Sequence, residues 1–115
     1  FKIWTDILYC KFGSVELVES SYKALPAIIK ELKNNSPVEI YVIGHADRVG
    51  SEKQNVNLSH RRSAWVKDTF ISSGIKSKII LISFYGESKP QISTADETPH
   101  PLNRRVELVA KFPKR

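Results

Sequence analysis

Residues 38–47 read VEIYVIGHAD and carry the strongest structural signal in the chain. The segment Val38–Gly44 is nearly continuously apolar, which is typical of a strand in the interior of a sheet. The segment His45–Gln54 is polar and contains Gly50, so it is predicted to be a loop. The pattern therefore predicts a central strand whose carboxyl end leads into a polar loop.

Two helices are predicted on either side of this strand. In Glu19–Asn34 apolar residues recur at helical spacing, although Pro26 has no N–H to donate to the preceding turn. This helix is expected either to start late or to kink at Pro26. The second helix is predicted over Val56–Ser73 and is expected to end at Gly74, because glycine favours the position just after a helix.

Three further strands are predicted, over Ile3–Phe12, Lys78–Tyr85 and Arg105–Phe112. The last of them alternates apolar and polar residues, which favours a strand with one wet face or an edge strand. A long polar loop, Gly86–Asn103, precedes it. The order β-α-β-α-β-β predicts an α/β (α+β) two-layer sandwich, with a mixed sheet and the helices on one face.

Length and composition fit a single domain over residues 1–115. The chain begins with Phe1 rather than Met, so it is expected to be excised from a longer or lipidated protein. No apolar run approaches the roughly 20 residues of a membrane helix. The net charge of +6 favours an anionic partner. Cys10, the single cysteine, is expected to be a small buried residue.

One charged residue falls where a core residue is expected. On a helical wheel Arg62 lies in the middle of the apolar sector of the second helix, between Leu58 and Val66, and Arg61 lies at the edge of that sector. A buried guanidinium keeps its charge and needs oxygen-rich partners. The plain alternative is that Arg62 reaches the surface with its charged end or makes a structural ion pair.

Asp47 gives this residue a possible functional context. It follows the central strand, and ligands of α/β sheets gather beyond the carboxyl ends of the strands. The helix that carries Arg62 comes next in the chain, so both side chains are expected to face one cleft. A carboxylate and a guanidinium in one cleft suit a zwitterion, whose ammonium and carboxylate they would bind.

Several short motifs follow one another along the chain: Gly44-His45-Ala46-Asp47, Asn55, Leu58-Ser59-His60-Arg61-Arg62, Tyr85-Gly86-Glu87 and Asn103-Arg104-Arg105. With their spacing intact, these motifs resemble the OmpA C-terminal domain family. Within it the chain looks closest to the peptidoglycan-associated lipoproteins.

The resemblance implies non-covalent binding of peptidoglycan through diaminopimelate, the zwitterionic residue of the stem peptide. In this family the aspartate and the last arginine of these motifs contact diaminopimelate, and Asp47 and Arg62 keep their spacing of fifteen positions. Asn55 is expected to hydrogen-bond the ligand, and Leu58 to line the pocket. The turn Phe12-Gly13-Ser14 would complete the site, with Gly13 in place of the family's usual polar residue. Supporting roles are expected for three further residues: Arg104, Arg61 and His45.

The same resemblance implies a periplasmic domain at the outer membrane or cell wall, with other envelope proteins as further partners. A membrane tether would lie outside this segment. No cofactor and no metal ion are implied. His45 is expected to be a strand-end residue that hydrogen-bonds the backbone.

Other function classes are weighed against this one. Neither a Gly-x-Ser-x-Gly element nor a His-x-x-x-His spacing is present, so catalysis is not expected. Basic and aromatic residues do not cluster on one predicted strand face, which disfavours nucleic-acid binding. The alternative that stays open is a protein–protein interaction module of a secretion system or flagellar stator, with weak or no wall binding.

Overall fold

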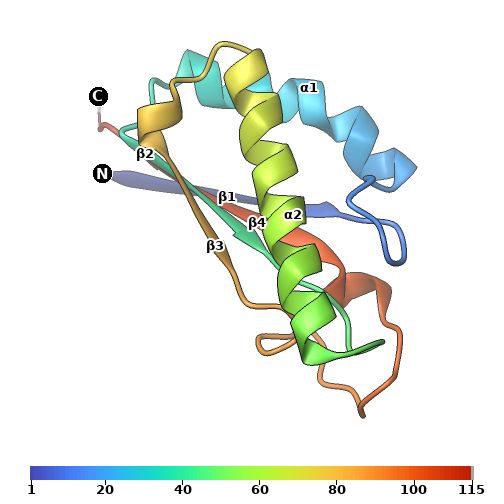
Figure 1. Cartoon of the computed structure of the whole chain (residues 1–115). Coiled ribbons are helices and arrows are strands. Elements are labelled where there is room, and N and C mark those ends of the chain that lie inside the picture. Colours follow the sequence, from blue (N-terminus) through green and yellow to red (C-terminus); the bar gives the residue numbers. More distant parts are fainter. Residues whose placement is uncertain (115) are drawn as a thin grey trace.

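Four strands form one sheet, and two helices cover one of its faces (Figure 1). The computed structural model describes residues 1–114, so Arg115, the last residue of the predicted domain, lies outside the described residues. The predicted element order and the two-layer arrangement are confirmed. The strands are β1 (Lys2–Tyr9), β2 (Glu39–Gly44), β3 (Ile80–Phe84) and β4 (Arg105–Phe112), and the helices are α1 (Glu19–Asn34) and α2 (Glu52–Ser72).

The strand order across the sheet is β1-β4-β2-β3. β2 and β3 run parallel, and β4 is antiparallel to both of its neighbours, so the sheet is mixed as predicted. β2 is interior, which confirms that prediction. β4 is also interior, so the idea of an edge strand is wrong. Its alternation comes instead from a sheet that has helices on one face only.

Strand β1 ends three residues earlier than predicted. After Tyr9 the chain makes one isolated bridge, between Cys10 and Leu17, and then turns back on itself at Gly13. Gly13 has φ +60, which glycine adopts without a steric penalty. The turn at residues 11–14 therefore lies at the end of the sheet opposite the two termini (Figure 1).

Both helices differ from expectation at one point. α1 continues through Pro26, so the late start is wrong; Pro26 is exposed, and water can bind the carbonyl that its ring leaves unpaired. α2 begins four residues early, at Glu52, because Ser51 and Gln54 form a reciprocal capping box. Gly74 follows the helix with φ +99, as its predicted stop role requires.

The buried face of α2 changes character along its length. Its last turns bury Val66 and Phe70 in the main core, where Cys10 also lies, as expected. The first turns bury polar residues instead, namely Asn55, Ser59, Arg62 and Ser63. This polar half packs very closely on the end of β2: a Cβ added to Gly44 would lie 2.0 Å from the Ser59 carbonyl oxygen. The fold thus brings a polar helix surface onto the carboxyl end of β2.

Candidate functional site

Asp47 lies just beyond the end of β2 and is 5% exposed. Its Oδ2 accepts a hydrogen bond from Arg104 Nη1 at 3.0 Å and one from the His100 backbone N–H at 3.3 Å. Arg104 therefore binds the predicted site residue Asp47 directly. The Arg104 guanidinium also lies 5.7 Å from the centre of the Phe12 ring, so it connects Asp47 to the turn that follows β1.

Arg62 is 1% exposed and binds the backbone of two other segments. Its Nε donates to the Ser14 carbonyl at 2.8 Å, its Nη2 to the Lys11 carbonyl at 3.2 Å and its Nη1 to the His45 carbonyl at 2.8 Å. The ideas that Arg62 extends to the surface or forms a structural ion pair are wrong, because its partners are neutral carbonyl oxygens. One guanidinium thus joins the turn after β1 to the end of β2.

Burial lowers the pKa of the Arg62 guanidinium, and the nearby Asp47 carboxylate acts in the opposite direction. Arginine stays protonated even so, and the site retains its charge. Arg61, Arg62 and Arg104 influence one another there, with Asp47 as the carboxylate among them. Within this cluster three guanidiniums lie close to one carboxylate.

An open hollow of about 540 Å³ lies beside these charges. Five of the predicted site residues line it, namely Phe12, Gly13, Asn55, Leu58 and Arg61. The other lining residues are Val49, Gln54 and Asn57. Asp47 and Arg62 do not line the hollow, and both are buried. The expected open cleft between the two charged side chains is therefore closed in this structure. Ser14 also lies off the hollow, and its carbonyl is the acceptor for Arg62.

Asn55 is held by the loops on either side of it. Its amide nitrogen donates to the Val49 carbonyl at 3.0 Å and to Glu87 Oε1 at 3.1 Å. Glu87 also accepts from Arg48 Nε at 3.0 Å, so this carboxylate joins the loop after β2 to the loop after β3. The amide oxygen of Asn55 is the atom that remains for a ligand. The sequence analysis missed this role of Glu87.

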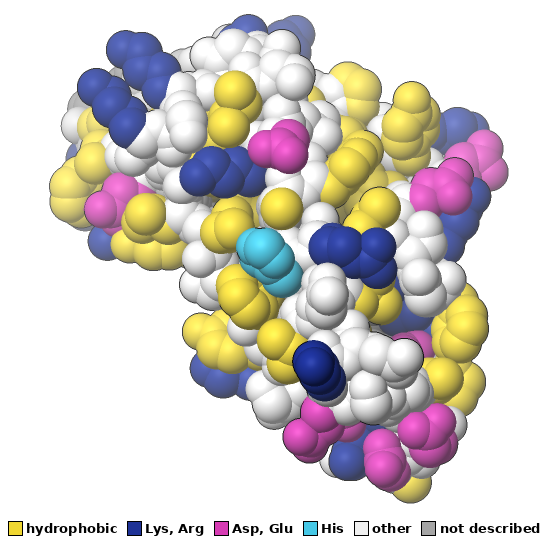
Figure 2. All heavy atoms as spheres, viewed as in Figure 1, with side chains coloured by type: hydrophobic (Ala, Val, Ile, Leu, Met, Phe, Trp, Pro, Cys, Tyr) yellow, Lys and Arg dark blue, Asp and Glu magenta, His cyan; other side chains and the backbone are white. Residues whose placement is uncertain are grey.

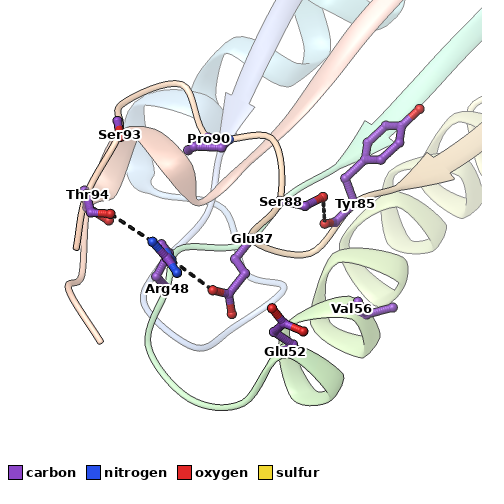
Figure 3. Close-up of a pocket in the computed structure, with 9 residues that line it drawn as sticks. All are labelled: Arg48, Glu52, Val56, Tyr85, Glu87, Ser88, Pro90, Ser93 and Thr94. Atoms are coloured by element: carbon purple, nitrogen blue, oxygen red, sulfur yellow. Dashed lines mark hydrogen bonds and ion pairs between the residues drawn. The ribbon is translucent and has the colours of Figure 1, made fainter. Parts of the chain in front are cut away.

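Arg48 and Glu87 also line a second hollow, of about 430 Å³, shown in Figure 3. Arg48 lies between Glu87 and Thr94, donating to the carboxylate of one and to the backbone carbonyl of the other at 3.0 Å each (Figure 3). Arg48 and Glu87 are 39 positions apart, and nothing in either motif alone indicates that they pair. The ion pair fixes the long loop at residues 86–103 over the end of the sheet.

His45 does not bind the backbone through its side chain as predicted. Its Nε2 lies 2.5 Å from Glu107 Oε1, and Arg105 lies beside the same carboxylate at 3.5 Å. The imidazole is 2% exposed. Burial lowers the pKa of His45, helped by Arg105 and opposed by Glu107. His45 contacts Glu107 because β2 lies next to β4, and this pairing brings Glu107 to the end of β2.

Within residues 1–114 no cluster of three or more His, Cys, Asp or Glu residues is placed to hold a metal ion. Within the same range no helix combines the length and apolar character needed to span a membrane.

The family model described as "OmpA family" matches residues 9–104. Outer membrane protein A of Atlantibacter hermannii is 31% identical over 122 residues, which cover 96% of this chain and 50% of that protein. The chain thus spans half the length of this curated relative. The OmpA-family match includes these motifs as far as Arg104, and Arg105, the last residue of the Asn103-Arg104-Arg105 motif, lies one position beyond it.

Solved structures with the same fold include two from other bacteria. The peptidoglycan-associated lipoprotein from Burkholderia pseudomallei has a TM-score of 0.80 at 24% identity, covering 91% of this chain and 89% of its own. The cell wall anchor of the T6SS from Pseudomonas aeruginosa has a TM-score of 0.78 at 18% identity, covering 96% and 82%. At these identities the likeness concerns the fold alone.

Proposed function

The chain belongs to the OmpA family, and from this premise we propose that it binds peptidoglycan non-covalently and anchors an envelope protein to the cell wall. The proposed location is the periplasm, at the outer membrane or the wall. The proposed role is binding without catalysis. Support comes from the names of two proteins with this fold, a peptidoglycan-associated lipoprotein and a cell wall anchor.

The observation that carries the proposal is the charged cluster beside the 540 Å³ hollow. In the proposed complex the ammonium of diaminopimelate binds Asp47, whose present bonds both end on Oδ2. The side-chain carboxylate of diaminopimelate binds Arg62, and Arg61 lies on the rim of the hollow. A stem peptide carries more carboxylates than ammonium groups, so a cluster with excess guanidinium charge complements it.

Binding requires the turn at residues 11–14 to move, because Arg62 is 1% exposed beneath it. Arg62 donates to the carbonyls of Lys11 and Ser14 in this turn, and a ligand carboxylate would replace them as acceptor. Hydrogen bonds between two charged groups are stronger than those to a neutral carbonyl, so the exchange is favourable. Gly13 has open space around its Cα, which leaves room for the turn to shift.

The proposal is tested by sedimentation of the purified domain with isolated sacculi. We expect the wild-type domain to pellet with sacculi and the folded Asp47→Asn variant to stay in solution. Asparagine keeps the size of the side chain and can still accept from the His100 N–H, so it removes mainly the charge. Retention of this variant at the wild-type level would refute the proposed site.

A second candidate function is favoured by the closed state of the site. Asp47 and Arg62 already have partners within the chain, so this arrangement is complete without a wall ligand. The scaffold would then act as a protein–protein interaction module of an envelope machine. This candidate gains support if the folded wild-type domain does not pellet with sacculi at all.

A further inference from the structure

A third hollow, of about 580 Å³, lies between α1 and α2, on the other side of the loop at residues 11–17. Its apolar lining consists of Val15, Leu17, Tyr22 and Trp65. Its volume falls within the roughly 300–1,000 Å³ of typical ligand sites. Hydrophobic side chains are visible between the two helices in Figure 2.

Two aromatic rings give this hollow its chemistry. Tyr22, near the start of α1, is 65% exposed. Trp65 packs against the core and is only partly buried, so it adds a second ring to the lining. Aromatic faces carry partial negative charge, and they attract the weakly positive C–H groups of a flat apolar surface. Two such rings in a solvent-open hollow suit a ligand with an apolar face.

The charged residues at the rim compensate one another. Lys11 pairs with Glu16 at 3.0 Å, and Glu19 pairs with Lys23 at 2.9 Å. This rim therefore offers hydrogen-bond donors and acceptors without a net charge, in contrast to the guanidinium cluster next to the first hollow. The combination fits an uncharged ligand with many hydroxyl groups and C–H faces, which is the chemistry of a sugar ring.

One loop and one helix contribute residues to both hollows. Phe12 and Gly13 line the first hollow, and Lys11 and Val15, from the same loop, line this one. On α2, Arg61 and Trp65 are four residues apart, so they lie about 6 Å apart along the helix axis. Two amino acids lie between diaminopimelate and the sugar in a stem peptide, so the link spans at least three residue steps, roughly 10 Å when extended. A peptide held in the first hollow can therefore place its sugar in this one.

We propose that the Tyr22–Trp65 hollow binds the N-acetylated hexosamine to which the stem peptide is attached. The inference rests on the proposed function, since it assigns a second subsite to the same ligand. The pyranose ring stacks on Tyr22 and Trp65. Its hydroxyl and acetamido groups bond the carboxylates of Glu16 and Glu19 and the ammonium of Lys11.

The test compares two ligands by calorimetry: the diaminopimelate-containing tripeptide alone and the same tripeptide attached to its disaccharide. We expect the wild-type domain to bind the disaccharide-peptide about tenfold more tightly. Tyr22→Ala should lose this gain while its affinity for the bare tripeptide stays unchanged. Tyr22→Phe, which keeps the ring, should retain the gain. In NMR spectra the indole N–H signal of Trp65 should shift with the disaccharide-peptide only, and that of Trp4 should not move.

Equal affinity of the wild-type domain for the two ligands would overturn this inference and leave the proposed function intact. So would a full gain in the Tyr22→Ala variant. If neither ligand binds the folded wild-type domain, the proposed function itself is refuted, and the sugar subsite with it.

Discussion

Replacing Arg62 with alanine tests how the end of the sheet is held together. The Arg62 guanidinium is 1% exposed and donates to the carbonyls of Lys11, Ser14 and His45 at 2.8–3.2 Å. Each of these hydrogen bonds has a charged donor and contributes about 1.5–3 kcal/mol. Removing the side chain also leaves a cavity beneath the turn.

The desolvation of the guanidinium offsets part of this stabilisation, because a buried charge is costly to remove from water. We therefore expect Arg62→Ala to lower the free energy of unfolding by about 3–4 kcal/mol, which is less than the sum of the three hydrogen bonds. With an m-value of about 1.5 kcal/mol/M, the urea midpoint falls by roughly 2 M.

The assay is urea denaturation followed by circular dichroism, with Arg61→Ala as the matched control. Arg61 precedes Arg62 on the same helix but is exposed, so its loss should change the free energy of unfolding by no more than about 0.5 kcal/mol. A decrease in the free energy of unfolding of less than about 1 kcal/mol for Arg62→Ala, or equal decreases for both variants, would show that the hydrogen bonds of Arg62 do not hold the end of the sheet together.

Four further substitutions test other parts of the structure. Gly44→Ala, whose Cβ would lie 2.0 Å from a carbonyl oxygen of α2, should destabilise the domain in urea by about 3 kcal/mol; Gly13→Ala, in open space at φ +60, should cost only about 1 kcal/mol. Burial keeps the pKa of His45 below its usual value, so the stability that neutral His45 contributes is present above the unfolded pKa, near 6.5, and is lost as pH falls through the folded pKa. Between pH 7 and pH 5 the melting temperature of His45→Gln should therefore fall by less than that of the wild-type domain. The Asn103 side chain accepts a hydrogen bond from the N–H of Ile92 and donates one to its carbonyl. Asn103→Asp should therefore speed amide hydrogen exchange in the loop at residues 86–103. Unchanged exchange would show that these two hydrogen bonds do not hold the loop.

Local patterns predicted the elements of the fold, and long-range pairing decided what they could not. The apolar run Val38–Gly44 and the helical spacing of the two helices depend on short-range periodicity, so they were visible in the sequence. The interior position of β4 was not visible in the sequence, because apolar and polar residues alternate in the same way in an edge strand and in an interior strand with one uncovered face. The early start of α2 was encoded in Ser51 and Gln54, and the capping box there was overlooked.

The sequence indicated several residues that gather at this end of the sheet, but not the contacts that they make. The conflict between the charge of Arg62 and its apolar surroundings indicated a buried guanidinium, and it is buried. Its acceptors are backbone carbonyls, which have no sequence signature because every residue carries one. The pairs Arg48–Glu87 and His45–Glu107 likewise join segments 39 and 62 positions apart. Only the folded sheet brings those side chains together.

The proposed function requires the domain to recognise diaminopimelate through a charged cluster that includes Asp47. Calorimetric titration of the purified domain with a diaminopimelate-containing stem peptide tests it most directly, with the lysine-containing peptide as the matched control. Lysine lacks the side-chain carboxylate of diaminopimelate, so it cannot replace the backbone carbonyls as acceptor for Arg62. We predict saturable binding of the first peptide, and binding at least tenfold weaker for the second. Equal binding of the two peptides, or no binding of either peptide to the folded domain, would contradict the recognition of diaminopimelate by this cluster.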